Sequence, residues 1–429
     1  MGKKKALLLG AGFSYDLGMP LANGLTKDLF HFLIPERLEK YIKIWKLAEP
    51  YGVERPIDPK VIDEVKELYL LYRSKEDSNY EEFLKEIQNE YHKLGASQIR
   101  RDTLHFVFGR FFEMIVQMFW MYQANNFNWY LKNREFYYSF SKFVPVDEEV
   151  WVVSLNHDLF IELLCIELDI PISFGSNGTI DIPESNINLQ QRLTFESIER
   201  INMNLNNMQF IRNNRGVNLI KLHGGINEFS FDDDSKVLQI AIEKGDTSFS
   251  YLYKTQKALH ELKYLINGEP AKISREIAVS DLQGKMQFLR KSILTGGYKY
   301  SETFNPKPGE EKMQLMEEVL ETVDEITIIG YGFGDEHVNL RLYNAMLLNK
   351  ELSIVIVDPY RRDIPKILKP FDYKMRVRMA RCGGPEWLSY VEKERWDKEL
   401  MNGLKENREI RALFDMEYRN RFLSPKIYS

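Results

Sequence analysis

Five short, largely apolar runs stand out along the chain, and their length and composition predict buried strands. Each has four to six residues, which is typical of a strand and too short for most helices. Apolar residues that follow one another without alternation indicate a strand covered on both faces, as in a parallel sheet. The runs are Ala6–Leu9, Val150–Leu155, Val217–Leu222, Ile326–Ile329 and Ser353–Val357.

Glycines or polar residues follow every one of these runs. In an open α/β sheet, ligands bind in a crevice beyond the carboxyl ends of the strands. Five such clusters at five strand ends are therefore expected to meet in one crevice. The predicted fold is of the α/β class, a Rossmann-like open parallel sheet. In chain order the clusters are Gly10-Ala11-Gly12, Asn156-His157-Asp158, His223-Gly224-Gly225, Gly330-Tyr331-Gly332 and Asp358-Pro359.

A long segment between the first two runs predicts a large inserted helical module. We place this insertion at about 36–145, where Asp63–Tyr72 has apolar residues spaced near 3.6. Met114–Leu131 has no formal charge but carries several Gln and Asn residues. We therefore interpret it as a buried aromatic helix rather than a membrane span.

The remaining segments predict a covering region and a tail around a main domain at 1–360. The stretch 171–215 is rich in Asn, Ser and Ile and is expected to be irregular. A second irregular insertion, at about 230–320, is expected to cover the site or to mediate contacts. Residues 361–429 are expected to form a helical C-terminal extension, because their end is charged and has helical spacing.

Composition narrows the class of protein. The chain has 429 residues with 44% apolar residues, enough for a large core, and its net charge of −5 does not indicate direct nucleic-acid binding. Two cysteines are too few for a disulfide framework or a four-cysteine zinc site, so no metal is expected. The N-terminus has too short an apolar run for a signal peptide, and a cytoplasmic location is expected.

The first glycine turn predicts a pocket for a phosphate. Glycine lets the backbone approach an anion, and Ser14 adds a hydroxyl that could bind a phosphate or cap the following helix. The dinucleotide fingerprint of dehydrogenases would have a third glycine where this chain has Tyr15. It would also have an acidic residue after a second strand, and the segment Phe30–Pro35 has none. Hydride transfer is therefore disfavoured.

The later clusters each allow a structural and a functional interpretation. Asn156 or Asp158 could cap the next helix, or they could hold a water, a ribose hydroxyl or an amide. His223 lies beside two glycines that clear space for it, and it could act as a general base. The turn that begins at Gly330 could be a bare turn or could let amides approach a second phosphate. Asp358 could bind ribose hydroxyls or make an Asx turn.

Taken in order, these motifs resemble the sirtuin-like superfamily, and most of all the bacterial sirtuin-like proteins of antiphage defence. The motifs are Gly-Ala-Gly-x-Ser-x-x-x-Gly-x-Pro, Asn-x-Asp, Leu-His-Gly and Gly-Tyr-Gly-Phe-x-Asp. The resemblance covers about Lys5 to Asp358 and would make 1–360 a sirtuin-like NAD-binding and hydrolase domain. It leaves out the insertions and the tail.

The resemblance also implies roles for particular residues. Asn156 would position the attacking water, His223 would be the base at the ribose hydroxyl, and Asp158 would bind the nicotinamide carboxamide. The residues implied to contact the pyrophosphate are Gly10, Ala11, Gly12 and Ser14. Those implied to hold the adenosine side are Gly330, Tyr331, Gly332 and Asp358.

Two departures from the sirtuin pattern favour hydrolysis of NAD over protein deacylation. The chain has no C-x-x-C pair, and Leu155 stands where deacylases have Gln. The expected function is an NAD+ glycohydrolase (NADase) that cleaves the nicotinamide–ribose bond and depletes NAD in antiphage defence by abortive infection. A sensor module that binds NAD or ADP-ribose without turnover, and an NAD-dependent deacylase, are the alternatives. A homo-oligomer is expected, and the resemblance implies a DNA-translocating ATPase of the HerA type, or another defence protein, as a possible partner.

Overall fold

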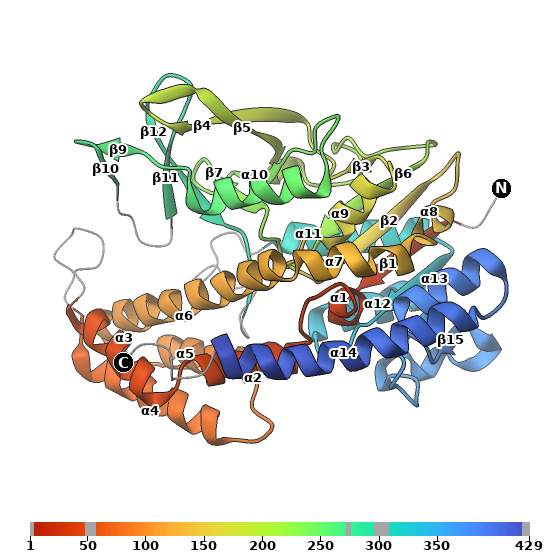
Figure 1. Ribbon diagram of the computed structural model, residues 1–429, viewed down its shortest axis with the longest axis horizontal. Coiled ribbons are helices and arrows are strands. Elements are labelled where there is room, and N and C mark those ends of the chain that lie inside the picture. The colour runs from red at the N-terminus through yellow and green to blue at the C-terminus, as the bar shows by residue number, and fades with distance from the viewer. Residues whose placement is uncertain (1–3, 48–56, 272–275, 296–308, 423–429) are drawn as a thin grey trace.

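The computed structural model describes residues 4–47, 57–271, 276–295 and 309–422. At its centre is a seven-stranded sheet in the order β15-β14-β13-β1-β2-β6-β3, in which every neighbouring pair is parallel (Figure 1). The strands are β1 (Lys5–Leu9), β2 (Glu149–Ser154), β3 (Ile172–Ser173), β6 (Gly216–Lys221), β13 (Glu325–Ile329), β14 (Ser353–Val357) and β15 (Val377–Ala380).

The five predicted strands are all present and parallel, so the predicted fold class is confirmed. They are β1, β2, β6, β13 and β14, and they form the middle of the sheet. The apolar pattern does not predict the edge strands β3 and β15. These have two and four residues, only one of them buried, so neither leaves a continuous apolar run.

The strand order places the topological switch point between β1 and β13, which is where open sheets of this kind bind ligands. From β1, the chain first adds β2 and β6 on one side of the sheet. It then returns to the other side of β1 and adds β13, β14 and β15. This is the doubly wound order. The turns that begin at Gly10 and Gly330 follow β1 and β13.

Alternating residues of β1 pack into two different cores. Leu7 and Leu9 join a core built with the insertion between β1 and β2, whereas Ala6 and Leu8 join a core on the other face of the sheet. This second core takes most of its helical residues from α11 (Glu310–Thr322) and α12 (Glu336–Leu348). Burial on both faces explains why β1 has no polar alternation.

Helices fill the chain between β1 and β2. The longest, α6, has 28 residues and includes most of the segment that the sequence predicts to be a buried helix. It ends at Asn125, and α7 begins at Phe127. Among the described residues, no helix combines the length and the apolar character that spanning a membrane requires. The helices are α1 (Ala11–Tyr15), α2 (Ala22–Phe32), α3 (Pro35–Leu47), α4 (Pro59–Ser74), α5 (Tyr80–His92), α6 (Gln98–Asn125), α7 (Phe127–Asn133) and α8 (Phe140–Phe143).

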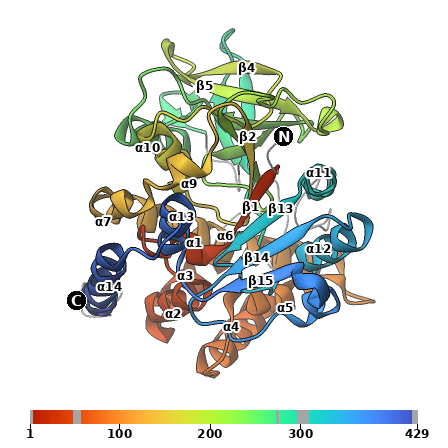
Figure 2. The ribbon, with the colours of Figure 1, turned by 90° about the vertical axis from the view of Figure 1, so that its right-hand side faces the viewer.

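A second sheet forms where the sequence predicts irregular structure. It is six-stranded and antiparallel, in the order β11-β12-β7-β8-β5-β4, and Figure 2 shows it as a layer apart from the parallel sheet. In β5 the second half alternates between buried and less buried residues, so no apolar run marks it as a strand. The strands are β4 (Gly178–Ser185), β5 (Asn188–Glu199), β7 (Glu228–Phe231), β8 (Lys236–Ile240), β11 (Glu276–Ser280) and β12 (Met286–Lys291).

Further helices connect the two sheets and end the chain. Helices α9 (Phe160–Glu167) and α10 (Ser248–His260) pack against each other between the sheets. After β15, α13 (Gly384–Lys393) and α14 (Lys398–Phe422) form the helical C-terminal part. In Figure 1, α14 runs alongside α1.

Candidate active site

The turns after β1 and β13 are locked together at the switch point of the sheet. The N–H of Gly10 donates to the Ile329 carbonyl at 2.9 Å, and the N–H of Gly12 donates to the Gly330 carbonyl at 3.0 Å. A Cβ on Gly12 would lie 2.7 Å from the Gly330 Cα, and one on Gly330 would lie 2.4 Å from the Gly12 Cα. Glycine is therefore required here for backbone to pack on backbone.

This packing uses donors that a phosphate cradle would otherwise offer. The N–H groups of Gly10, Gly12 and Phe13 all donate to carbonyls of the protein, and Ala11 begins the short helix α1. Gly332 differs, since a Cβ there would meet nothing within 4 Å. The predicted pyrophosphate contacts stay predictions, and the second turn leaves open space beside Gly332 and Gly334.

Asn156 ties the end of β2 to the turn after β1. Its Nδ2 donates to the Gly10 carbonyl at 2.9 Å and to Ser14 Oγ at 3.0 Å. These bonds fix the plane of the side-chain amide, so that its oxygen, Oδ1, can accept a hydrogen bond from a water. The sequence singled out Asn156 and Ser14 separately, and the structure brings them into contact.

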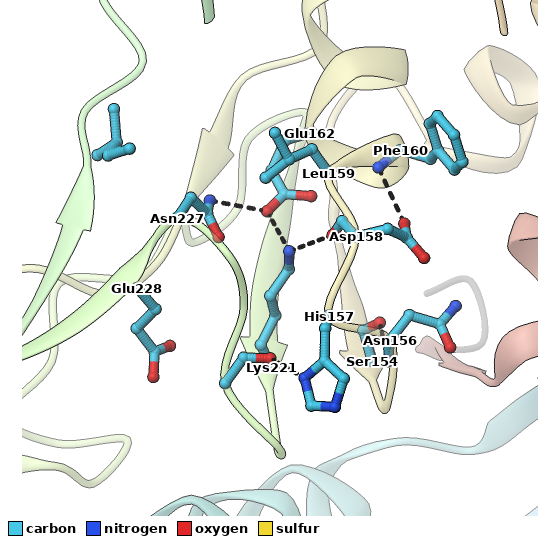
Figure 3. Close-up of polar contacts among 12 residues, drawn as sticks. Ser154, Asn156, His157, Asp158, Leu159, Phe160, Glu162, Lys221, Asn227 and Glu228 are labelled. Carbon is cyan, nitrogen blue, oxygen red and sulfur yellow. Dashed lines mark hydrogen bonds and ion pairs between the residues drawn. The ribbon is translucent and has the colours of Figure 1, made fainter. Parts of the chain in front are cut away.

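Asp158 makes a local contact at the start of α9, and its predicted role toward a ligand stays a prediction. Its Oδ1 accepts from the Phe160 N–H at 3.1 Å, at the start of α9 (Figure 3). Burial raises the pKa of Asp158, while the Lys221 charge and a hydrogen bond from Ser14 act in the opposite direction. Ser14 therefore links Asp158 to Asn156, and three predicted site residues form one hydrogen-bonded group.

His223 lies beside a carboxylate that the sequence analysis did not single out. His223 Nε2 is 3.0 Å from Asp335 Oδ2, and both side chains are buried or nearly so. The other Asp335 oxygen accepts from the N–H groups of His337 and Val338, because Asp335 is the N-cap of α12. Asp335 ends the Gly-Tyr-Gly-Phe-x-Asp motif, so its place in that motif was the available signal.

The strand register places Asn156 and His223 at matching positions. Ser154 and Lys221, the last residues of β2 and β6, pair with each other. Asn156 and His223 each lie two residues after the end of their strand. Neighbouring strands lie about 4.8 Å apart, so the two strand ends lie side by side at the same edge of the sheet. Between them His157 is held by Nδ1, which lies 3.1 Å from the Gly224 carbonyl oxygen.

A buried ion pair supports the exit of β6. Lys221 Nζ lies 2.6 Å from Glu162 Oε1 and donates to the Asp158 carbonyl at 2.5 Å (Figure 3). Asn227 Nδ2 donates to the same Glu162 oxygen at 3.0 Å and to the Tyr251 hydroxyl. Burial raises the pKa of Glu162, and Lys221 opposes that rise. A lysine within a buried strand was the sequence signal for this network.

The predicted adenosine-side residues are held by local contacts. The Tyr331 hydroxyl accepts from the Asp335 N–H at 3.1 Å, and burial, with the Asp335 charge, raises the Tyr331 pKa. Asp358 accepts from the N–H groups of Tyr360 and Arg361, which is the Asx turn that the sequence allowed. Arg361 donates to the Gly332 carbonyl at 3.0 Å and so joins the ends of β13 and β14.

The residues at the strand ends offer several kinds of hydrogen-bonding group. In the part of the chain that the structure describes, no group of three or more His, Cys, Asp or Glu side chains could hold a metal. The strand ends offer an amide, a hydroxyl, a buried carboxyl group and an imidazole beside a carboxylate. These groups can hold a carboxamide, ribose hydroxyls and a water molecule.

Neither the family models nor the curated proteins give a match to the sequence. Among solved structures, a mutant Sir2 homologue in complex with 2'-O-acetyl ADP ribose is similar at 12% identity over 94% of this chain and 93% of that chain. Its TM-score is 0.33, too low to support an argument. The Rossmann-like fold therefore rests on the strand order and register of this chain.

Proposed function

We propose that this protein is an NAD+ glycohydrolase that releases nicotinamide and ADP-ribose. The observation that supports this most is the coupling of Asn156 to Ser14 and Asp158 beside the paired His223 and Asp335. These groups lie at the switch point of a doubly wound sheet, where dinucleotides bind in folds of this order.

To cleave the nicotinamide–ribose bond, the protein has to position the substrate and the water and to stabilise the charge that develops. Nicotinamide leaves as a neutral molecule from a cationic substrate, and the ribosyl carbon passes through an oxocarbenium-like state. The side-chain oxygen Oδ1 of Asn156 would orient the attacking water. The water oxygen bonds to the ribosyl carbon as the bond to nicotinamide breaks, and the water releases a proton. His223, with Asp335 behind it, would accept a hydrogen bond from a ribose hydroxyl and so support the developing positive charge.

Two substitutions test the assignment. Asn156→Ala and His223→Ala are each expected to abolish nicotinamide release from NAD+, measured by chromatography, while the circular dichroism spectrum stays that of the wild type. His92→Ala is the matched control, because His92 is exposed at the end of α5. Full turnover in both site variants would refute the assignment.

The two alternatives give different products in the same assay. Saturable binding of NAD+ without nicotinamide release would support a sensor module. Release of nicotinamide only when an acyl-lysine peptide is present would support a deacylase. An NADase releases nicotinamide from NAD+ and water alone.

We further propose that NAD depletion serves antiphage defence in the cytoplasm, with a homo-oligomer or a HerA-type ATPase as the controlling assembly. Uncontrolled hydrolysis would kill the host, so an inactive state is required. Cells that express the wild-type chain, with and without such a partner, are expected to lose NAD on phage infection, and cells that express Asn156→Ala are not. Equal phage titres in the two strains would contradict this role.

A further inference from the structure

The C-terminal helix contacts the segment that follows the first glycine turn of the chain. Arg408 of α14 donates to both oxygens of Asp16, at 2.8 and 2.7 Å, from Nε and Nη2. The same guanidinium donates to Glu386 of α13 at 2.7 and 3.1 Å. Burial alone would lower the pKa of Arg408, but these hydrogen bonds more than offset that effect and raise it. Arg408 thus joins two helices of the tail to this segment.

A second arginine of α14 holds the next residues of the same segment. Arg411 is 4% exposed, and its guanidinium carbon lies 4.1 Å from the centre of the Tyr15 ring. Its Nη2 donates to the Met19 carbonyl at 2.6 Å. Tyr15 stands where the dinucleotide fingerprint has its third glycine, so this departure from the fingerprint gives the tail an aromatic ring to contact.

The other side of this segment is held by the helical insertion. The Tyr137 hydroxyl donates to the Phe13 carbonyl at 2.6 Å, and Trp129 Nε1 donates to the Asp16 carbonyl at 3.0 Å. Asn126 Nδ2 donates to the Gly18 carbonyl at 2.7 Å. The segment from Phe13 to Met19 therefore lies between two sets of polar contacts, one from the insertion and one from the tail.

Ionic and polar contacts, more than apolar packing, hold α14 against the rest of the protein. Among its described side chains only Leu404 and Arg411 are buried. A cavity of about 360 Å³ remains beside the helix, with Trp129 and Phe414 among its lining residues. The Phe414 ring of α14 contacts the Trp129 ring edge to face. Because few side chains of the helix are buried, its position still depends largely on the two arginines.

We propose that α14 is a clamp on residues 13–19, the segment that follows the glycine turn, and that Arg408 and Arg411 are positioning residues for the site. The path is short, because Tyr15 and Asp16 directly follow Ser14, which bonds to Asn156 and Asp158. Releasing the clamp lets Ser14 move and so misplaces the Asn156 amide. The effect on turnover rests on the proposed NADase function, whereas the hold on this segment does not.

The test compares Arg408→Gln with Lys405→Gln, which changes an exposed cation of the same helix. Arg408→Gln is expected to lower NAD+ turnover by about 10- to 100-fold, the scale of a misplacement of about 1 Å. Lys405→Gln is expected to leave turnover unchanged. In hydrogen exchange, the amides of Leu17, Gly18 and Met19 should exchange faster only in Arg408→Gln, because they donate to the Ser14 and Tyr15 carbonyls within the clamped segment.

A double-mutant cycle separates the clamp from a general loss of stability. Asp16→Asn together with Arg408→Gln should lower turnover no further than Arg408→Gln alone, since both remove the same contact. Additive losses, or wild-type exchange at these three amides in Arg408→Gln, would overturn the clamp. If the wild type itself releases no nicotinamide, the NADase proposal fails, and the exchange measurement still decides whether α14 holds residues 13–19.

Discussion

Gly330 and Gly332 lie two residues apart in one turn, and the structure predicts opposite results when each is replaced by alanine. Gly330 has a φ of +65°, and a Cβ there would lie 2.4 to 2.5 Å from backbone atoms of Gly12 and Phe13. Left-handed backbone costs a non-glycine residue roughly 1–2 kcal/mol. Overpacking against atoms that cannot turn away adds about 1–3 kcal/mol. Gly330→Ala is therefore expected to lower the free energy of unfolding by about 2–5 kcal/mol.

Gly332→Ala is the matched control, since a Cβ at that position would meet nothing within 4 Å. Its free energy of unfolding should stay the same or rise by about 0.4–1 kcal/mol, because alanine restricts the unfolded chain. Urea unfolding followed by circular dichroism measures both variants. If the two free energies agreed to within about 0.5 kcal/mol, the reasoning from backbone packing would be refuted. A raised KM for NAD+ in stable Gly332→Ala would indicate that the substrate lies against this glycine.

Three further predictions concern the buried charges. Glu162→Gln is expected to lower the free energy of unfolding by about 3–5 kcal/mol in urea unfolding, because it leaves the Lys221 ammonium buried beside a neutral amide. Asp335→Asn should keep the α12 cap and its stability and yet lower NAD+ turnover. Asp335→Ala should lower turnover and also lose about 0.5–2 kcal/mol of stability in the same unfolding assay. Wild-type turnover in Asp335→Asn would count against a role for this carboxylate beside His223. Burial raises the pKa of Asp158, so the native state holds the proton more tightly than the unfolded chain. The free energy of unfolding should then fall as the pH rises from about 4 through the raised native pKa, and unfolding curves across this range should show a smaller fall in Asp158→Asn.

Much of the parallel sheet could be predicted, because a strand buried on both faces is a continuous apolar run in the sequence. The strand Ser353–Val357 is an apolar run in the sequence for the same reason that it lies in the middle of the sheet. The antiparallel sheet could not be predicted in this way. A strand such as Asn188–Glu199 has one face toward solvent for much of its length, and its polar residues hide the pattern.

The candidate site shows the same division. Asn156 and His223 could be found because each follows a predicted strand, and strand ends of a parallel sheet share an edge. Asp335 could not be assigned beside His223, since a cap at the start of α12 is a sufficient local reason for an aspartate there. Their roles in NAD hydrolysis stay predictions.

The sequence by itself determined that this chain forms a Rossmann-like sheet whose strand ends carry glycine, amide, carboxyl and imidazole groups, because period and turn chemistry are local properties. Only the tertiary structure decided what those groups contact. Gly12 and Gly330 are glycines because two backbones meet there, and Asp16 bonds to Arg408 across 392 positions of the chain. Contacts between residues so far apart depend on how the helical insertion and the C-terminal helix pack, and no local pattern encodes that packing.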